Sequence, residues 1–382
     1  MAFEFIDDEL AQRESQDLLR SNVCIEEYQQ QFVKVSGQRF LNFSSNDYLG
    51  LAQAEIETDT NIVGSGGSPL VTGYSAQHRL LCDHIAQNTE REAVLLFNSG
   101  FAANSSVCQA LMNQEQQLIL SDKLIHASFI DGAMASKAQY KRFKHNDSAQ
   151  LTQLLQKYRS SHSDVLVASE SVFSMDGDQA PVSELVRQCQ EHDTWLMLDD
   201  AHGLGVFGKN GWGIVEQGGF EQEHIPILIG TFGKAVGTGG AFVAGSNALI
   251  EYLSNFARHY IYSTAFSPLH AATTLAHLNA MSEQNWRREK LNDNIQHFRA
   301  LATQLGIPLT ASVSAIQPIM IGEPKRALML SEQLMEKGFW VKAIRHPTVP
   351  KNSDRLRITL TSMHEKEDIT GLLQILAEAM SR

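Results

Sequence analysis

Three patterns are scarce in this 382-residue sequence: paired cysteines, basic clusters and long apolar runs. The four cysteines have no short paired spacing, which argues against a zinc site or a disulfide framework. The formal net charge is −12, and no stretch gathers the lysines and arginines that a nucleic-acid backbone requires. No apolar run approaches the roughly eighteen residues of a membrane span. The sequence therefore argues against nucleic acid and membrane as partners.

The N-terminal stretch MAFEFIDDELAQRE carries acidic residues where a signal peptide would have a basic start and an apolar stretch. We therefore expect a cytoplasmic protein. No HExxH motif occurs, and MDGD at 175–178 lacks the remaining ligands of a calcium loop. No metal site is expected.

Between about residues 90 and 245, short apolar runs alternate with longer stretches of helical pattern. The expected strands are 93–97, 118–120, 165–169, 195–199, 226–230 and 241–245. Near-continuous apolar strands separated by helices are typical of a mainly parallel sheet covered on both faces. The sequence therefore predicts a large α/β domain.

The pattern changes after residue 268. A long helical segment runs to about residue 306 and is followed by a strand-like stretch, a helix and two more strands, at 311–321, 325–338, 339–345 and 356–361. Ser362 and Glu365 have the spacing of a capping box and predict the start of the last helix. We predict three parts: an N-terminal segment (1–45), a large domain (46–284) and a small C-terminal α+β domain (285–382).

In open α/β sheets, ligands bind outside the carboxyl ends of the strands, so the residues after each apolar run are the first candidates. Ser99, Gly100 and Phe101 follow the first strand and lead into an expected helix, whose free N–H groups could bind a phosphate. That turn alone is a weak signal, because most such turns are ordinary connections.

Two further strand ends carry titratable side chains. Asp199 ends the strand at 195–199, and His202 follows it. An isolated aspartate there is usually a helix cap, but a carboxylate beside a pyridine nitrogen keeps that nitrogen protonated and makes the ring an electron sink. His126 follows another strand, and Glu170 and Ser174 could hydrogen-bond a phenolic oxygen. Each of these is also an ordinary loop residue when it stands alone.

The stretch GTFGKAVGTGG (230–240) places Lys234 among five glycines, directly after an apolar run. A surface turn is the ordinary interpretation. A P-loop does not fit, because its required glycine and hydroxyl positions hold Leu228 and Ala235. A lysine mounted at a strand end can instead form an imine with a carbonyl cofactor or substrate. Together with the phosphate turn, the carboxylate and the histidines, it predicts pyridoxal phosphate chemistry.

Eight motifs follow one another in the order found in a known enzyme family. They are NFSSNDYLGLA (42–52), GSGGS (64–68), TGYS (72–75), NSGFAAN (98–104), FSMDGD (173–178), DDAHGLGVFG (199–208), TFGKAVG (231–237) and YST (262–264). As a set they resemble the α-oxoamine synthases, which are fold-type I pyridoxal phosphate enzymes that join an amino acid to an acyl thioester with loss of carbon dioxide. The resemblance covers about residues 18 to 370, and the biotin-pathway branch is the most similar.

The resemblance implies a role for each matched residue. Lys234 would bind the cofactor covalently, Asp199 would pair with its pyridine nitrogen and His126 would stack on its ring. The other implied cofactor contacts are Gly100, Phe101, Ser174, His202, Thr231 and, toward the phosphate of the neighbouring subunit, Thr264. The implied substrate contacts are Arg20, His126, Thr348 and Arg357. Arg357 is the best match for an amino acid carboxylate, because a planar guanidinium binds it at two points.

The same branch implies L-alanine and a pimeloyl thioester of CoA or an acyl carrier protein as substrates, and a homodimer as the assembly. The alternative is a sister enzyme that uses glycine, either 2-amino-3-ketobutyrate CoA ligase or 5-aminolevulinate synthase. A non-catalytic scaffold and a Rossmann-type dehydrogenase are interpretations from other classes. The dehydrogenase is disfavoured because no GxGxxG opens a helix after an early strand. Pro69 and Leu70 depart from the family pattern in a loop near the acyl substrate.

Overall fold

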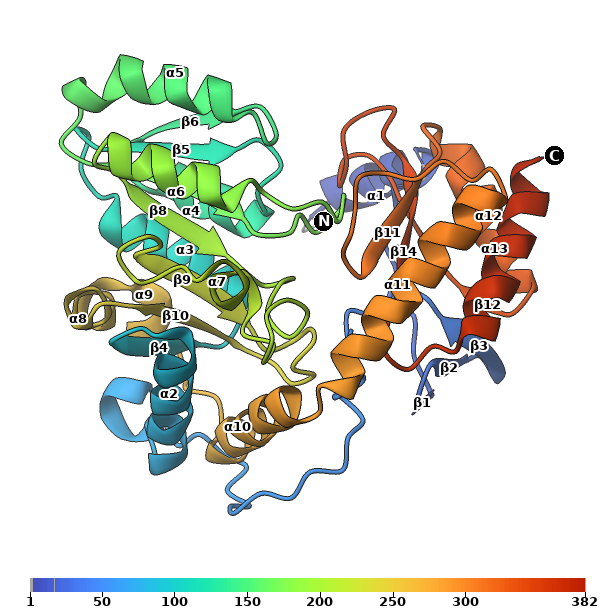
Figure 1. Ribbon diagram of the computed structural model, residues 1–382, viewed down its shortest axis with the longest axis horizontal. Coiled ribbons are helices and arrows are strands. Elements are labelled where there is room, and N and C mark those ends of the chain that lie inside the picture. Colours follow the sequence, from blue (N-terminus) through green and yellow to red (C-terminus); the bar gives the residue numbers. More distant parts are fainter. Residues whose placement is uncertain (1–2, 17, 382) are drawn as a thin grey trace.

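The computed structural model describes residues 3–16 and 18–381. Figure 1 shows two bodies, one built on a large sheet and one that contains the last three helices. Helix α10 (Pro268–Glu283) packs in the first body against α2 (Ala76–Thr89), and α11 (Trp286–Gln304) leads into the second. The single long helical segment expected here is therefore wrong, because the chain leaves the helix at Gln284 and Asn285.

The large sheet has seven strands in the order β4-β10-β9-β8-β7-β5-β6. Their bounds are β4 Ala93–Phe97, β5 Leu118–Asp122, β6 Gln139–Phe143, β7 Val165–Glu170, β8 Trp195–Asp199, β9 Ile227–Thr231 and β10 Ala241–Gly245. Only β10 runs antiparallel to its neighbours, so the mainly parallel α/β sheet is confirmed. The sequence analysis missed β6, because an edge strand that is half-exposed carries polar residues instead of an apolar run.

Helices cover both faces of this sheet. Besides α2 and α10 they are α3 Gly100–Leu111, α4 Ala127–Ala135, α5 Ser148–Tyr158, α6 Val182–Glu191, α7 Gly213–Gly218, α8 Asn247–Phe256 and α9 Arg258–Ile261. Successive side chains of β7 and β8 point to opposite faces of the sheet and belong to two different buried clusters. Leu166 and Met197 pack in one cluster, and Val167 and Leu198 pack in the other. Each fully buried side chain of this size contributes about 1.5–3 kcal/mol, so the central strands are fixed from both sides.

The second body combines both ends of the chain (Figure 1). After α1 (Phe5–Ser15), strands β1 (Glu27–Gln29), β2 (Phe32–Val35) and β3 (Gln38–Asn42) form one sheet with β12 (Phe339–Trp340). A second sheet has the order β11-β14-β13, with bounds Ile316–Met320, Arg355–Thr359 and Lys342–Ile344. Helices α12 (Pro324–Glu336) and α13 (Lys366–Met380) complete this body. The division into three parts at residues 45 and 284 stays a prediction.

Two local predictions in this body need correction. The capping box of the last helix is formed by Glu365 and Asp368, not by Ser362 and Glu365. Ser362 lies in the preceding turn, where its N–H donates to the carbonyl of Tyr48. The strand expected over 311–321 begins only at Ile316, because the backbone bends within residues 311–315.

In the described part of the chain, no helix combines the length and the apolar character needed to cross a membrane.

The connection between β9 and β10 contains Lys234 and packs against the backbone of Leu51 and Ala52. Gly237 makes this approach possible. Its φ is +74°, and a Cβ there would overlap the backbone of those two residues. At Gly233 the nearest atom to an added Cβ is the carbonyl oxygen of Thr238, at 3.9 Å. The two glycines of one loop therefore have different steric requirements.

We predict that Gly237→Ala lowers the free energy of unfolding by about 2–4 kcal/mol, because it adds a backbone clash to an unfavourable positive φ. Gly233→Ala is the matched control and should change it by less than about 0.5 kcal/mol. Denaturant unfolding of the two variants checks this. Equal stability of the two variants would contradict the packing described for the loop.

Candidate active site

The carboxyl ends of β7, β8 and β9 open onto one cavity of about 310 Å³. Nine residues singled out in the sequence line it: Ser99, Gly100, Phe101, His126, Glu170, Asp199, His202, Thr231 and Lys234. They come from the starts of α3 and α4, the ends of β7, β8 and β9, the turn after β8 and the β9–β10 connection. Residues far apart in the sequence therefore meet where the sheet topology places the strand ends.

Asp199 is buried and held by two donors. Its Oδ2 accepts from Nδ2 of Asn104 at 2.7 Å, and its Oδ1 accepts from the N–H of Ala201 at 3.0 Å. The same Nδ2 of Asn104 lies 3.1 Å from the Oγ of Ser128. A carboxylate with both oxygens hydrogen-bonded is fixed in orientation. Asp199 is therefore placed to accept a further hydrogen bond from a ligand nitrogen in the cavity.

The Lys234 side chain is half-buried, and the surroundings of its amine favour the neutral form. Burial lowers its pKa, while the nearby carboxyls of Asp199 and Glu170 act in the opposite direction. Arg357 adds to the lowering. A lysine amine is a nucleophile or a base only when it is neutral, so this environment raises the reactive fraction.

Both histidines of the cavity are neutral imidazoles near pH 7. Burial lowers the pKa of His126, whose Nδ1 lies 2.7 Å from the Oγ of Ser128 at the start of α4. Burial also lowers the pKa of His202 well below its usual range. The Nδ1 of His202 lies 2.7 Å from the hydroxyl of Tyr48, which fixes the ring by a buried hydrogen bond.

The start of α3 forms an anion cradle. Ser99 caps the helix, with its Oγ accepting from the N–H of Ala102, and Gly100 is the first helical residue. A Cβ on Gly100 would lie 2.7 Å from Cγ2 of Thr231, so the close approach of helix and strand requires glycine. The Oγ1 of Thr231 is buried without a hydrogen-bond partner. An unpaired buried hydroxyl costs about 1–3 kcal/mol, which an anionic ligand at the positive end of α3 would offset.

Five predicted site residues do not line this cavity. Arg357 and Ser174 are adjacent to it: Nε of Arg357 donates to the carbonyl of Ser174 at 2.7 Å, and its Nη1 donates to Oδ1 of Asn46, which lines the cavity, at 3.1 Å. Arg20 and Thr348 lie apart from it, joined to each other by a hydrogen bond of 3.4 Å. Arg20 is exposed.

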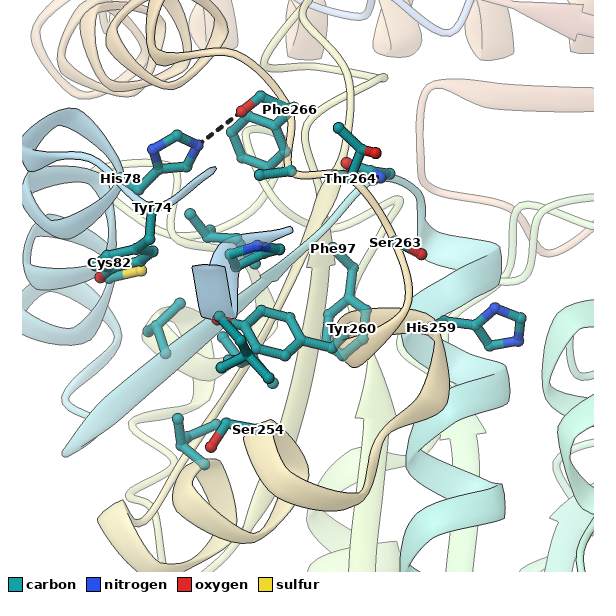
Figure 2. Close-up of a pocket in the computed structure, with 18 residues that line it drawn as sticks. Tyr74, His78, Cys82, Phe97, Ser254, His259, Tyr260, Ser263, Thr264 and Phe266 are labelled. Atoms are coloured by element: carbon teal, nitrogen blue, oxygen red, sulfur yellow. Dashed lines mark hydrogen bonds between the residues drawn. The ribbon is translucent and has the colours of Figure 1, made fainter. Parts of the chain in front are cut away.

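Thr264 lines a different cavity, of about 360 Å³, together with Tyr74, His78 and Tyr260 (Figure 2). In Figure 2, Nε2 of His78 is joined to the carbonyl of Phe266, at a distance of 2.8 Å. The two cavities are neighbours, because the carbonyl of Thr264 accepts from Nδ2 of Asn98, and the next residue, Ser99, lines the first cavity.

Three functional neighbours were not singled out from the sequence: Asn46, Tyr48 and Asn104. Asn104 stands four residues after Gly100, so the helical period places both on one face of α3, and this signal was available. Asn46 and Tyr48 belong to an irregular segment before α2. The packing of that segment against β14 and the β9–β10 connection brings Asn46 to the cavity and Tyr48 to His202 behind it.

Comparison with known proteins agrees with this geometry. Residues 38–376 match the family model described as aminotransferase class I and II. An 8-amino-7-oxononanoate synthase of Saccharophagus degradans is 46% identical over 357 residues, which are 91% of this chain and 89% of that protein. The chain therefore belongs to the aminotransferase class I and II family and, within it, to the 8-amino-7-oxononanoate synthases.

Two solved structures show the same architecture. An 8-amino-7-oxononanoate synthase from Francisella tularensis has a TM-score of 0.77 at 30% identity, covering 90% of this chain and 98% of that one. A serine palmitoyltransferase from S. paucimobilis with a bound PLP-myriocin aldimine has a TM-score of 0.89 at 25% identity, covering 99% of this chain and 97% of that one. The fold-type I architecture expected from the sequence is confirmed.

The buried hydrogen bond between Tyr48 and His202 is open to a direct test. We predict that Tyr48→Phe destabilises the protein by about 1–3 kcal/mol, because the Nδ1 of His202 loses its partner at 2.7 Å in a buried site. Tyr28→Phe is the matched control, since Tyr28 is exposed on the edge strand β1, and it should be neutral. Thermal unfolding measures both. A neutral Tyr48→Phe would show that the hydrogen bond does not hold the ring.

Proposed function

We propose that this chain catalyses the pyridoxal-phosphate-dependent condensation of L-alanine with a pimeloyl thioester. The products are 8-amino-7-oxononanoate, carbon dioxide and the free thiol, in biotin biosynthesis. Curated relatives named for this product support the proposal at 44–46% identity. One structural observation carries the proposal. The amine of Lys234, the carboxylate of Asp199 and the start of α3, which suits an anion, share one cavity.

The cavity residues fit the parts of pyridoxal phosphate. The start of α3 and the unpaired hydroxyl of Thr231 suit the phosphate. Asp199, oriented by Asn104, suits the protonated pyridine nitrogen. The neutral rings of His126 and His202 suit stacking and a hydrogen bond to the phenolic oxygen, and Lys234 suits covalent attachment.

Bound there, the cofactor supplies a carbon to which amines attach and a ring that accepts the electron pair of a carbanion. The chain supplies the proton transfer. The Lys234 amine would take the Cα proton of alanine, for which an ordinary lysine with a pKa of about 10.4 is a poor base near pH 7. Burial lowers the pKa of Lys234 and so increases its fraction in the basic form.

Arg357 is the residue we assign to the alanine carboxylate. It is buried on β14 next to the cavity, and its contacts to Ser174 and Asn46 use Nε and one N–H of Nη1. A guanidinium has five N–H donors in a planar fork, so it keeps donors beyond these two contacts for the two oxygens of a carboxylate. Arg20 and Thr348, joined to each other in the second body, are the proposed contacts for the acyl substrate.

We also propose a cytoplasmic homodimer, with Thr264 reaching the phosphate site of the neighbouring subunit. The segment around Thr264 supports this, because Leu70, Val71 and Tyr262 expose large apolar side chains there. Apolar side chains gathered on a surface are typical of protein contacts.

Turnover assays with defined substrates test the proposed function. We expect activity with L-alanine and pimeloyl thioester, supplied as the CoA ester and on an acyl carrier protein, since both present the same carbonyl. Glycine with acetyl-CoA or succinyl-CoA, and serine with palmitoyl-CoA, should be at least about 100-fold poorer in kcat/KM. A preference for glycine would identify a sister synthase instead.

Lys234→Ala should lower kcat by about 1000-fold or more, because the nucleophile and base is removed while the fold stays intact. Lys325→Ala, at an exposed position on α12, is the control and should keep full activity. Steady-state kinetics and circular dichroism of both variants provide the measurement. Near-normal turnover by Lys234→Ala would end the assignment.

Asp199→Asn should slow exchange of the alanine Cα proton with solvent deuterium by about 100-fold or more, and should weaken cofactor binding. The amide keeps the shape of the side chain but cannot stabilise a positive ring nitrogen. Asp193→Asn, at a side chain that is 96% exposed, is the control. Unchanged exchange kinetics, measured by NMR, would remove Asp199 from its role.

A further inference from the structure

Glu170 lines the cavity, and the proposed function gives it no role, although the sequence suggested it as a hydrogen-bond partner of a phenolic oxygen. It is the last residue of β7, and in the parallel pairing of β7 with β8 its partner is Asp199. Two carboxyl groups therefore stand side by side at neighbouring strand ends, with Lys234 close to both. Both side chains are buried, at 3% and 7% exposure.

The two carboxyl groups have different hydrogen-bond surroundings. Asp199 accepts from Asn104 at 2.7 Å and from Ala201 at 3.0 Å, so each of its oxygens has a donor. Glu170 accepts at Oε2 from the N–H of Ser174 at 3.2 Å, and its Oε1 is buried without a partner. A carboxylate needs donors on both oxygens when it leaves water, so the negative charge belongs on Asp199 and not on Glu170.

The electrostatics agree with this geometry. Burial raises the pKa of Glu170 to about 8, and the charge of Asp199 adds to that effect. Lys234 and the backbone N–H groups of Ser174 and His126 oppose it, although only the Ser174 N–H meets hydrogen-bond geometry. The titratable side chains that line the cavity with Glu170 are Asp199 from β8, His202 from the turn after it, Lys234 from the β9–β10 connection and His126 from the start of α4. Near pH 7 Glu170 is therefore mostly in its neutral form.

We propose that Glu170 is a further catalytic residue, which acts as a neutral carboxylic acid and donates the O–H of its unpaired oxygen to a negatively charged ligand oxygen in the cavity. The proposal rests on the proposed function for the identity of that ligand. The oxygen belongs either to the phenolate of the cofactor or to the acyl group after attack on the thioester. In both cases a hydrogen bond from a buried neutral acid stabilises the anion, and no proton is transferred.

Infrared spectroscopy of the apoenzyme tests the protonation state without any ligand. We expect a carboxylic acid carbonyl band at pH 7 that is absent in Glu170→Gln and disappears as the pH rises through about 8. No such band at pH 7 would mean that Glu170 is ionised, and would overturn the proposal. This result does not depend on the substrate, so it stands apart from any failure of the proposed function.

Two variants of the holoenzyme test the donor role. Glu170→Gln keeps an N–H donor, so its kcat at pH 7 should fall less than about threefold. The pH at which kcat declines on the alkaline side should change, because glutamine does not titrate. Glu170→Leu has no donor and should lose at least about tenfold. Equal losses in the two variants would show that the carboxylate form is required, and would overturn the proposal. If Glu170→Leu fails to fold, the infrared band and the pH profile of Glu170→Gln decide.

The same variants separate the two ligand oxygens. A phenolate partner predicts that Glu170→Leu changes the pH dependence of the absorption spectrum of the bound cofactor, before any substrate is added. An acyl oxygen predicts an unchanged spectrum and unchanged Cα proton exchange, with only condensation slowed. Either result supports a donor role. A variant unchanged in spectrum, exchange and condensation would overturn it.

Discussion

The parallel register of β7, β8 and β9 is the constraint on which the rest of the site depends. Because these strands run side by side in one direction, Glu170 pairs with Asp199, and Asp199 pairs with Ile229, two residues before Thr231. Glu170, Asp199 and Thr231 therefore reach one edge of three central strands that are otherwise mostly buried. Burying these groups is costly, and the site offsets the cost where donors are present, as at Asp199.

The second body completes the site by binding the loop that follows β7. Nη1 of Arg355 donates to Asp176 at 2.8 Å, Nε of Arg357 donates to the carbonyl of Ser174, and the hydroxyls of Ser312 and Ser314 donate to the carbonyl of Gly177. These contacts hold the guanidinium of Arg357 beside the cavity. Arg357 on β14 and the strand ends that line the cavity are thus held by one loop, although they belong to different sheets.

The sequence predicted what regular patterns encode. Apolar runs located six strands of the large sheet, and the polar residue at each strand end located Asp199 and Lys234, because the sheet topology leaves ligands no other edge. The sequence did not predict Asn46, which lines the cavity, or Tyr48, which bonds His202, because both lie in an irregular segment whose path no periodicity describes. The capping box was misplaced for a related reason: Ser362 has the correct spacing, but its N–H bonds the carbonyl of Tyr48 from a distant part of the chain.

The central claim is that Lys234, made reactive by its burial beside Asp199, holds the cofactor covalently. Borohydride reduction of the holoenzyme followed by peptide mass spectrometry tests this most directly, because reduction makes the lysine–cofactor bond permanent. The account predicts one cofactor-derived mass increment per chain, on the peptide that contains Lys234. A reduced protein without the increment, or with the increment on another lysine, would contradict it.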